Sequence, residues 1–201
     1  LSLQAPQEGT IVVLGKDTAD LGRPQRRQVR RDLQIVFQDP MASLDPRLPI
    51  FDIIAEPLRA NGWKKADIGP RIEELMELVG LEPSHANRYP RNFSGGQRQR
   101  IGIARALSVN PELVVADEPV SALDVSVQAQ VLNLMQDLQD EFGLSYILIS
   151  HDLAVVDLIC DEIAVMYLGR IVEQGTHAEL LAANGAYARL HATQFQDDVS
   201  D

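Results

Sequence analysis

Two short segments of this sequence carry residues whose types and spacing suit the handling of a phosphorylated ligand. Ser94-Gly95-Gly96-Gln97 is a small-residue turn that opens a predicted helix, and Leu113–Glu118 is an apolar strand that ends in two carboxylates. The N-terminus of a helix offers free backbone N–H groups and the positive end of a dipole, which suit a phosphate. A carboxylate at a strand end suits Mg²⁺, and a second one beside it can handle a water molecule. Together the two segments predict nucleotide hydrolysis.

The two carboxylates differ in their expected tasks, and one histidine is expected at the same place. Asp117 suits Mg²⁺, while Glu118 suits the attacking water. His151 directly follows the apolar strand predicted over 146–149. Because ligands of open α/β sheets bind at the carboxyl ends of the strands, we expect His151 at the same sheet edge as Asp117. Considered singly, a surface acidic turn and a structural histidine are the alternatives.

The elements that must position these residues predict an α/β fold. Apolar strands that alternate with helices are typical of a parallel sheet. Helical periodicity prevails over 50–107, which predicts an inserted helical subdomain. The predicted strands are 11–14, 32–37, 113–116 and 146–149, with a hairpin over 163–173, and the proline-containing stretch 38–49 is predicted as a loop. The predicted helices include one that Asp124 caps and Gly143 ends, one over 152–160 and a tail over 176–195.

Composition and charge limit the kinds of partner. The 201 residues are 45% hydrophobic and 23% charged, as in a globular protein, and no apolar run reaches the length of a membrane span. The formal net charge of -11 argues against nucleic acid as the main partner. Cys160 is the single cysteine, which excludes an internal disulfide or a cysteine zinc site and agrees with a cytoplasmic protein.

One segment is basic although the sequence as a whole is acidic. It contains Arg23, Arg26, Arg27, Arg30 and Arg31. Such a run is either a patch that binds an anion or nucleic acid, or a solvated helix face before the next strand. The second interpretation is preferred, because charge runs are usually solvated.

Five short motifs resemble those of the ATP-binding subunit of ABC transporters. Ser94–Gln97 resembles the signature motif, and Leu113–Glu118 resembles the Walker B motif. Phe37–Pro40 resembles the Q-loop, Ser121–Asp124 resembles the D-loop, and Ile149–Asp152 resembles the segment with the switch histidine. Five motifs in the family order argue strongly against chance agreement.

The resemblance covers about residues 9–175 and points to the dipeptide/oligopeptide importer branch of the family. The carboxyl end departs from that branch, because Glu173–Leu181 and Gly185–His191 look more like the end of ABC exporters. Peptide importers often carry an iron–sulfur cluster in a regulatory tail, and one cysteine cannot hold such a cluster. The segments whose residues resemble those of the importer branch are 38–47, 54–58, 88–90 and 117–126.

The resemblance implies a P-loop NTPase-type fold. That fold has a RecA-like parallel sheet core, an inserted helical subdomain and, here, a truncated N-terminal antiparallel β part. The resemblance also implies one ABC ATPase domain over residues 1–201. Its expected parts are the β part with the Q-loop (1–49), the helical subdomain with the signature (50–107), the RecA-like core (108–175) and a helical tail (176–201).

The resemblance further implies a role for each motif residue, with ATP and Mg²⁺ as cofactors. Glu118, His151 and Gln38 are expected to be catalytic, and Asp117 and Gln38 are expected to hold Mg²⁺. In this family two nucleotide domains clamp two ATP molecules, and the signature of one domain faces the ATP of the other. The residues expected on the partner's ATP are Ser94, Gly95, Gly96, Gln97 and Asp124.

The implied partners are a second ABC ATPase domain and transmembrane permease subunits, without nucleic acid. The chain is therefore expected in the cytoplasm, peripheral on the inner face of the cell membrane. Three functions stay open at this point. The favoured one is the ATPase subunit of an importer of peptides or other small solutes. The others are a non-transport ABC ATPase that acts on DNA or ribosomes, and a non-catalytic partner that only donates its signature.

The family's P-loop, G-x-x-x-x-G-K-[ST], has no match in the 201 residues. The stretch from Gly9 to Lys16 comes near, but five residues separate its glycines and Asp17 stands where Ser or Thr is needed. A P-loop supplies the lysine and the N–H donors for the β- and γ-phosphates. We therefore expect this polypeptide alone neither to bind ATP tightly nor to hydrolyse it. We also expect exposed apolar surface and low stability as a monomer.

Overall fold

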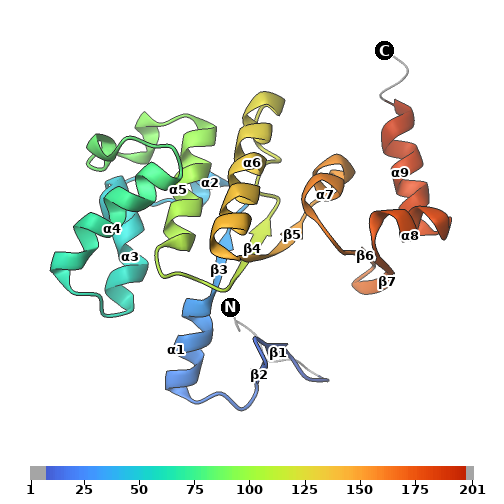
Figure 1. Ribbon diagram of the computed structural model, residues 1–201, viewed down its shortest axis with the longest axis horizontal. Helices are drawn as coiled ribbons and strands as arrows, with labels where there is room; N and C mark the ends of the chain where they lie inside the picture. Colours follow the sequence, from blue (N-terminus) through green and yellow to red (C-terminus); the bar gives the residue numbers. More distant parts are fainter. Residues whose placement is uncertain (1–7, 198–201) are drawn as a thin grey trace. The chain divides into compact units, whose positions relative to one another are not determined.

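The computed structural model describes residues 8–197, which form two compact units. The first unit extends to Ile149 and the second begins at Ser150 (Figure 1). Each unit is described by itself below. The predicted single domain over 1–201, with its four parts, stays a prediction, and its first seven and last four residues lie outside the described part.

A three-stranded parallel sheet in the order β3-β4-β5 forms the centre of the first unit. The strands are β3 (Leu33–Val36), β4 (Leu113–Asp117) and β5 (Ser145–Ile149). Val36 lies opposite Ala116, and Asp117 lies opposite Ile149. Strands of this apolar kind suit a parallel sheet that helices cover. The predicted parallel α/β sheet is confirmed, and Asp117 ends its central strand (Figure 1).

The stretch 50–107 is helical, as predicted. Its elements are α3 (Ile50–Ala60), α4 (Lys65–Leu78), the 3-10 turns η1 (Pro83–His85) and η2 (Pro90–Asn92), and α5 (Gly95–Leu107). The apolar stripe of α4 is fully buried at Ile72, Leu75 and Met76, and α4 packs on both α3 and α5. Gly80 has a φ of 70°, a left-handed conformation that glycine adopts without strain as the chain leaves the helix.

Helix α6 (Val125–Phe142) begins and ends where the sequence predicts. Asp124 is its N-cap residue, and Gly143 follows its last turn with a φ of 62°. Met135 of α6 and Tyr146 of β5 line one small apolar pocket with residues of β3, β4 and α5. Helices α5 and α6 therefore share one core with the sheet.

The predicted strand over 11–14 is only partly correct. Strand β1 (Val12–Val13) is short and pairs antiparallel with β2 (Lys16–Asp17). Leu14 and Gly15 connect them, with φ values of 48° and 73°. Two successive residues with positive φ form the tight turn that matches the twist of a hairpin. The sequence pattern missed this turn because leucine rarely adopts that conformation.

The predicted loop over 38–49 is wrong for its first part, which contains helix α2 (Pro40–Ser43). Asp39 caps this helix, since its carboxylate accepts a hydrogen bond of 2.7 Å from the Met41 N–H. Pro40 occupies the first helical position, where its fixed φ and missing N–H are tolerated. The proline that predicts a loop is therefore the start of a helix.

The arginine-rich segment forms helix α1 (Arg23–Asp32), directly before β3. All five arginines named above are exposed, whereas Val29 and Asp32 are buried against the rest of the first unit. The structure therefore confirms the prediction that this run forms a solvent-exposed helix face.

The second unit consists of a hairpin with helices around it. Its elements are α7 (Leu153–Ile159), β6 (Ile163–Tyr167), β7 (Arg170–Gly175), α8 (His177–Ala182) and α9 (Ala186–Asp197). Strands β6 and β7 are antiparallel, as predicted, and Tyr187 of α9 is fully buried in the core of this unit. The carboxylate of Glu173 accepts hydrogen bonds from the N–H groups of Tyr187 and Ala186, which lower the pKa of Glu173.

Apolar side chains are exposed at strands of both units. Within the described residues, β5 pairs with β4 on one side only, and its Ile147 and Ile149 are each 49% exposed. In the second unit, Met166 and Leu168 are 68% and 85% exposed. The expected exposure of apolar surface is therefore present, and the low stability of a monomer stays a prediction. Among the described helices, none is both long and apolar enough to cross a bilayer.

Candidate nucleotide site

The signature turn (residues 94–97) is a capped helix N-terminus. Ser94 is the N-cap of α5, and its hydroxyl accepts a hydrogen bond of 3.3 Å from the Gln97 N–H. In return, the Gln97 side chain accepts a hydrogen bond of 3.0 Å from the Ser94 N–H. The N–H groups of Gly95 and Gly96 lie in the first turn, where the helix itself supplies no acceptor. The turn therefore presents donors that suit a phosphate.

Close packing explains the two glycines of the signature turn. A Cβ at Gly96 would lie 2.3 Å from Cγ1 of Val127, and a Cβ at Gly95 would lie 3.2 Å from Cδ2 of Leu123. Val127 lies in the first turn of α6, and Leu123 belongs to the D-loop (residues 121–124). The structure therefore brings the signature turn next to the segment that ends at Asp124.

Gln128 of α6 holds the D-loop in place. Its side-chain amide donates hydrogen bonds of 3.1 Å to the Val120 carbonyl and 2.9 Å to the Leu123 carbonyl. Asp124 itself is exposed, and its side chain makes no cap hydrogen bond to α6. The sequence analysis missed Gln128, because a glutamine inside a helix gives no signal that it bonds to a preceding loop.

The two carboxylates lie at the end of the central strand. Asp117 is the last residue of β4, and the Glu118 N–H donates a hydrogen bond of 2.8 Å to the Ile149 carbonyl. Glu118 has a φ of 43°, a left-handed conformation that costs a non-glycine residue about 1 kcal/mol or more. Such strain is common where a side chain must point in a particular direction for function.

Gln38 and Glu118 are joined although 80 positions separate them in the sequence. The Gln38 Nε2 donates a hydrogen bond of 2.7 Å to the Glu118 Oε2. The contact follows from the topology, since Gln38 comes just after β3 and Glu118 comes just after its parallel neighbour β4. The structure thus brings together two of the three residues that were expected to be catalytic, and their roles stay predictions.

Arg105 of α5 anchors the Q-loop (residues 37–40) and the short helix after it. Its guanidinium donates a hydrogen bond of 2.6 Å to the Ser43 carbonyl and lies over the Phe37 ring, 5.9 Å from the ring centre. Burial lowers the pKa of the Arg105 guanidinium, and the Glu56 carboxylate opposes that shift. In the sequence, the one signal for this contact is that a charged arginine stands within the apolar run 101–107. The prediction of the site did not use that signal.

Replacing Arg105 by lysine is expected to destabilise the protein by about 2 kcal/mol, the range for hydrogen bonds to charged groups. Lysine keeps the charge but cannot bond to the Ser43 carbonyl and stack on the Phe37 ring at once. Urea unfolding measures the change. Arg47→Lys is the matched control, because Arg47 is exposed and pairs only with Asp45, and its change is expected to stay below about 0.5 kcal/mol. Equal changes in the two variants would contradict the anchoring role.

The second unit holds the third residue that was expected to be catalytic. His151 is the second residue of that unit, two positions after Ile149. Its place at the same sheet edge as Asp117 therefore stays a prediction.

The oxygen donors at the end of β4 fit a nucleotide-bound Mg²⁺. Within residues 8–197, no group of three or more His, Cys, Asp or Glu side chains could hold a metal ion. Mg²⁺ in nucleotide sites takes only one or two protein ligands and fills its other positions with water and phosphate oxygens. Asp117 can supply such a carboxylate. Gln38 bonds to Glu118 through its nitrogen, which leaves its amide oxygen as a second donor.

Sequence comparisons identify the family of this chain. A family model described as ABC transporter matches residues 1–121. The chain is 59% identical over 180 residues to the oligopeptide transport ATP-binding protein OppD of Mycobacterium tuberculosis, which covers 90% of this chain and 29% of that protein. It is 54% identical over 182 residues to the oligopeptide transport ATP-binding protein OppF of Salmonella typhimurium, which covers 90% of this chain and 54% of that protein. The chain thus spans 29% to 54% of the length of these curated relatives.

Two solved structures share the fold. One is cbiO1 from Clostridium perfringens, described as part of the ABC transporter complex cbiONQ, with a TM-score of 0.79 at 26% identity over 96% of this chain and 79% of that chain. The other is the ATP-binding cassette MJ0796, a dimer in a post-hydrolysis state bound to ADP and Pi. Its TM-score is 0.72 at 29% identity over 87% of this chain and 75% of that chain. These likenesses confirm the predicted fold class.

Proposed function

Because this chain belongs to the ABC transporter family, we propose that it supplies the ATP-binding and ATP-hydrolysing part of a peptide importer. The relatives at 59% and 54% identity are named oligopeptide transport ATP-binding proteins, which supports peptides as the transported class. The proposed partners are a second ABC ATPase domain and permease subunits, at the inner face of the cell membrane. A non-transport ATPase that acts on DNA or ribosomes has no support in the names of these relatives.

The hydrogen bond between Gln38 and Glu118 carries the proposal. It joins the Q-loop to the second carboxylate at the strand end where Asp117 can hold Mg²⁺. When bound, Mg²⁺ neutralises negative charge on the phosphates. Glu118 orients the attacking water and accepts its proton, and the Gln38 amide holds the Glu118 carboxylate in position. This edge of the sheet thus serves an ATP that its own domain binds.

The signature turn serves a different ATP, the one that a second ABC ATPase domain binds. The N–H groups of Gly95 and Gly96 and the hydroxyl of Ser94 offer donors to its phosphates. Asp124 lies at the start of the neighbouring helix and faces the same partner. The MJ0796 structure is a dimer bound to ADP and Pi, which supports a two-domain arrangement here.

The 201 residues contain the signature and the carboxylates but no P-loop sequence. We therefore propose that these 201 residues by themselves neither bind ATP tightly nor hydrolyse it, whereas their signature turn can still act on a partner's ATP. Calorimetric titration with ATP and Mg²⁺ tests the first part. Micromolar affinity of the isolated polypeptide would contradict it.

A mixing experiment tests the signature role. The partner is a P-loop-containing relative whose own signature glycines have been replaced, so that its bound ATP lacks a working signature. Adding this polypeptide is expected to raise the partner's ATPase rate by about 10²-fold, the contribution of a preorganised donor to a charged transition state. An unchanged rate, despite complex formation in sedimentation, would count against the proposal.

A further inference from the structure

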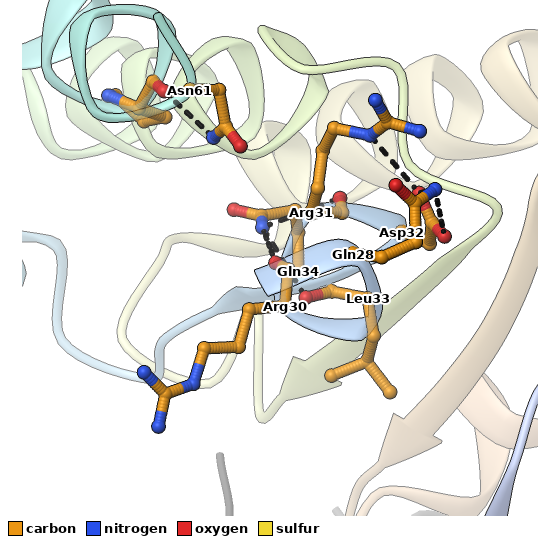
Figure 2. Close-up of polar contacts among 8 residues, drawn as sticks. Gln28, Arg30, Arg31, Asp32, Leu33, Gln34 and Asn61 are labelled. Carbon is orange, nitrogen blue, oxygen red and sulfur yellow. Dashed lines mark hydrogen bonds and ion pairs between the residues drawn. The ribbon is translucent and has the colours of Figure 1, made fainter. Parts of the chain in front are cut away.

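Helix α1 is basic although the sequence as a whole has 18 basic and 29 acidic residues, because α1 holds five of the arginines and a single carboxylate. Arg23, Arg26, Arg27 and Arg30 are spaced by three or four positions, so they form one stripe along the helix. All four are exposed. Figure 2 shows the Arg30 side chain extending away from the other residues drawn. The stripe is therefore available to a ligand outside the chain.

Three arginines of the stripe, Arg23, Arg26 and Arg30, do not stabilise the fold. Neighbouring like charges on a helix destabilise it, and Arg23 lies at the N-terminal end, where the helix dipole is positive. The first turn contains no acidic residue. Within the described residues, Arg23, Arg26 and Arg30 make no ion pair. For these three arginines, a costly arrangement without internal ion pairs is explained by an anion that binds from outside, whereas Arg27 also bonds to the Ala60 carbonyl.

The one carboxylate of α1 does not offset the stripe. Asp32 is buried, and it accepts a hydrogen bond of 2.7 Å from Gln28 and forms an ion pair of 3.1 Å with Arg31 (Figure 2). The Asp32 carboxylate is thus paired on the buried side of the helix and does not neutralise the stripe. The exposed side of α1 keeps its positive charge.

The connection between α3 and α4 extends this basic surface. Arg27 donates a hydrogen bond to the Ala60 carbonyl at the end of α3. Trp63 and two exposed lysines follow within a few residues of that contact. Besides the buried Asp32, Asp20 and Asp67 are the nearest acidic residues along the two segments. We define the basic patch as Arg23, Arg26, Arg27, Arg30, Lys64 and Lys65.

We propose that the basic patch binds the anionic headgroups of a lipid bilayer. Arginine presents a planar fork that matches phosphate oxygens. The stripe lies along the exposed side of a helix about 15 Å long, which suits a layer of headgroups better than a single small anion. Trp63 is half-buried beside the lysines, and tryptophan is typical of the membrane–water interface.

The proposal deepens the proposed function, because it assigns a contact by which a transporter subunit meets the membrane surface. Its test uses no nucleotide, so its failure is distinguishable from a failure of the ATPase role. The polypeptide is mixed with vesicles of phosphatidylcholine, with or without phosphatidylglycerol. Binding is measured by sedimentation and by the emission of Trp63, the single tryptophan of the chain.

Binding is expected to require phosphatidylglycerol and to weaken as salt is added. The triple variant Arg23→Gln, Arg26→Gln, Arg30→Gln is expected to bind about 10²-fold more weakly, since each basic residue near an anionic surface contributes about fivefold. The matched control replaces three exposed arginines elsewhere, Arg47, Arg91 and Arg170, by glutamine. It changes the net charge equally and is expected to bind as the parent does. Circular dichroism verifies that both variants are folded.

Three results would overturn the proposal. The first is binding that does not depend on phosphatidylglycerol. The second is an equal loss of binding in the two triple variants, which would show an effect of net charge alone. The third is tighter binding to soluble polyglutamate or duplex DNA than to the vesicles at the same salt, which would assign the patch to a protein or a nucleic acid.

Discussion

Replacing Glu118 by glutamine is expected to lower the rate of ATP hydrolysis by about 10²- to 10⁴-fold, the contribution of a positioned general base. The experiment uses an ATPase in which the P-loop segment of a relative precedes residue 8 of this chain. The loss is expected in kcat, because glutamine cannot accept the proton of the attacking water. ATP affinity is expected to stay within about threefold, since the new side chain keeps an oxygen that can accept from the Gln38 amide.

A matched control distinguishes catalysis from a general effect of charge. Glu112 directly precedes β4, so Glu112→Gln removes a carboxylate at the opposite end of the same strand. That variant is expected to keep the parent's rate. If Glu118→Gln and Glu112→Gln had similar rates, the assignment of Glu118 to the attacking water would be wrong.

Replacing Gly96 by alanine is expected to abolish most of the stimulation in the mixing experiment, by about 10²-fold. The added Cβ would lie 2.3 Å from Cγ1 of Val127, so the start of α5 must move away from α6. A displacement of about 1 Å in a group that positions a reacting phosphate can cost that much rate. The measurement is the ATPase rate of the signature-deficient partner as this polypeptide is added.

The same helix supplies the control for Gly96. A Cβ at Gly102 would meet no atom within 4 Å, so Gly102→Ala adds a methyl group without a clash. Alanine also favours a helix over glycine by about 1 kcal/mol. Gly102→Ala is therefore expected to stimulate as the parent does and to be at least as stable. Full stimulation by Gly96→Ala would contradict a role for the signature turn in contact with a partner's ATP.

Local chemistry accounts for the parts of the fold that could be predicted from the sequence. The helix from Val125 to Phe142 ends at the left-handed Gly143, a signal that acts within one turn, and it begins after Asp124, although that side chain makes no cap hydrogen bond. Helix α2 was missed because Pro40 serves equally well in a turn and at the first position of a helix. The Asp39 cap that decides between them depends on one hydrogen bond that the residue types alone do not fix.

The candidate site could be predicted only in outline, because its contacts join distant segments. The rule for parallel sheets places Gln38 and Glu118 at one edge, but it fixes neither their hydrogen bond nor the positive φ of Glu118. The contact of Arg105 with the Ser43 carbonyl crosses 62 positions and has no local signature. Such contacts are set by packing of whole elements, which a pattern along the chain does not contain.

The edge of β5 that faces away from β4 has no strand partner within residues 8–197, which creates a risk of wrong pairing during synthesis. A strand that is paired on one side, with Ile147 and Ile149 each 49% exposed, invites any extended segment that reaches it. In a crowded cell, newly made chains, including copies of this one, can pair with that edge. Pairing between copies can continue into aggregates. The yield of folded protein is therefore expected to depend on how soon another protein segment covers that edge. It is also expected to depend on chaperones that cover the edge until then.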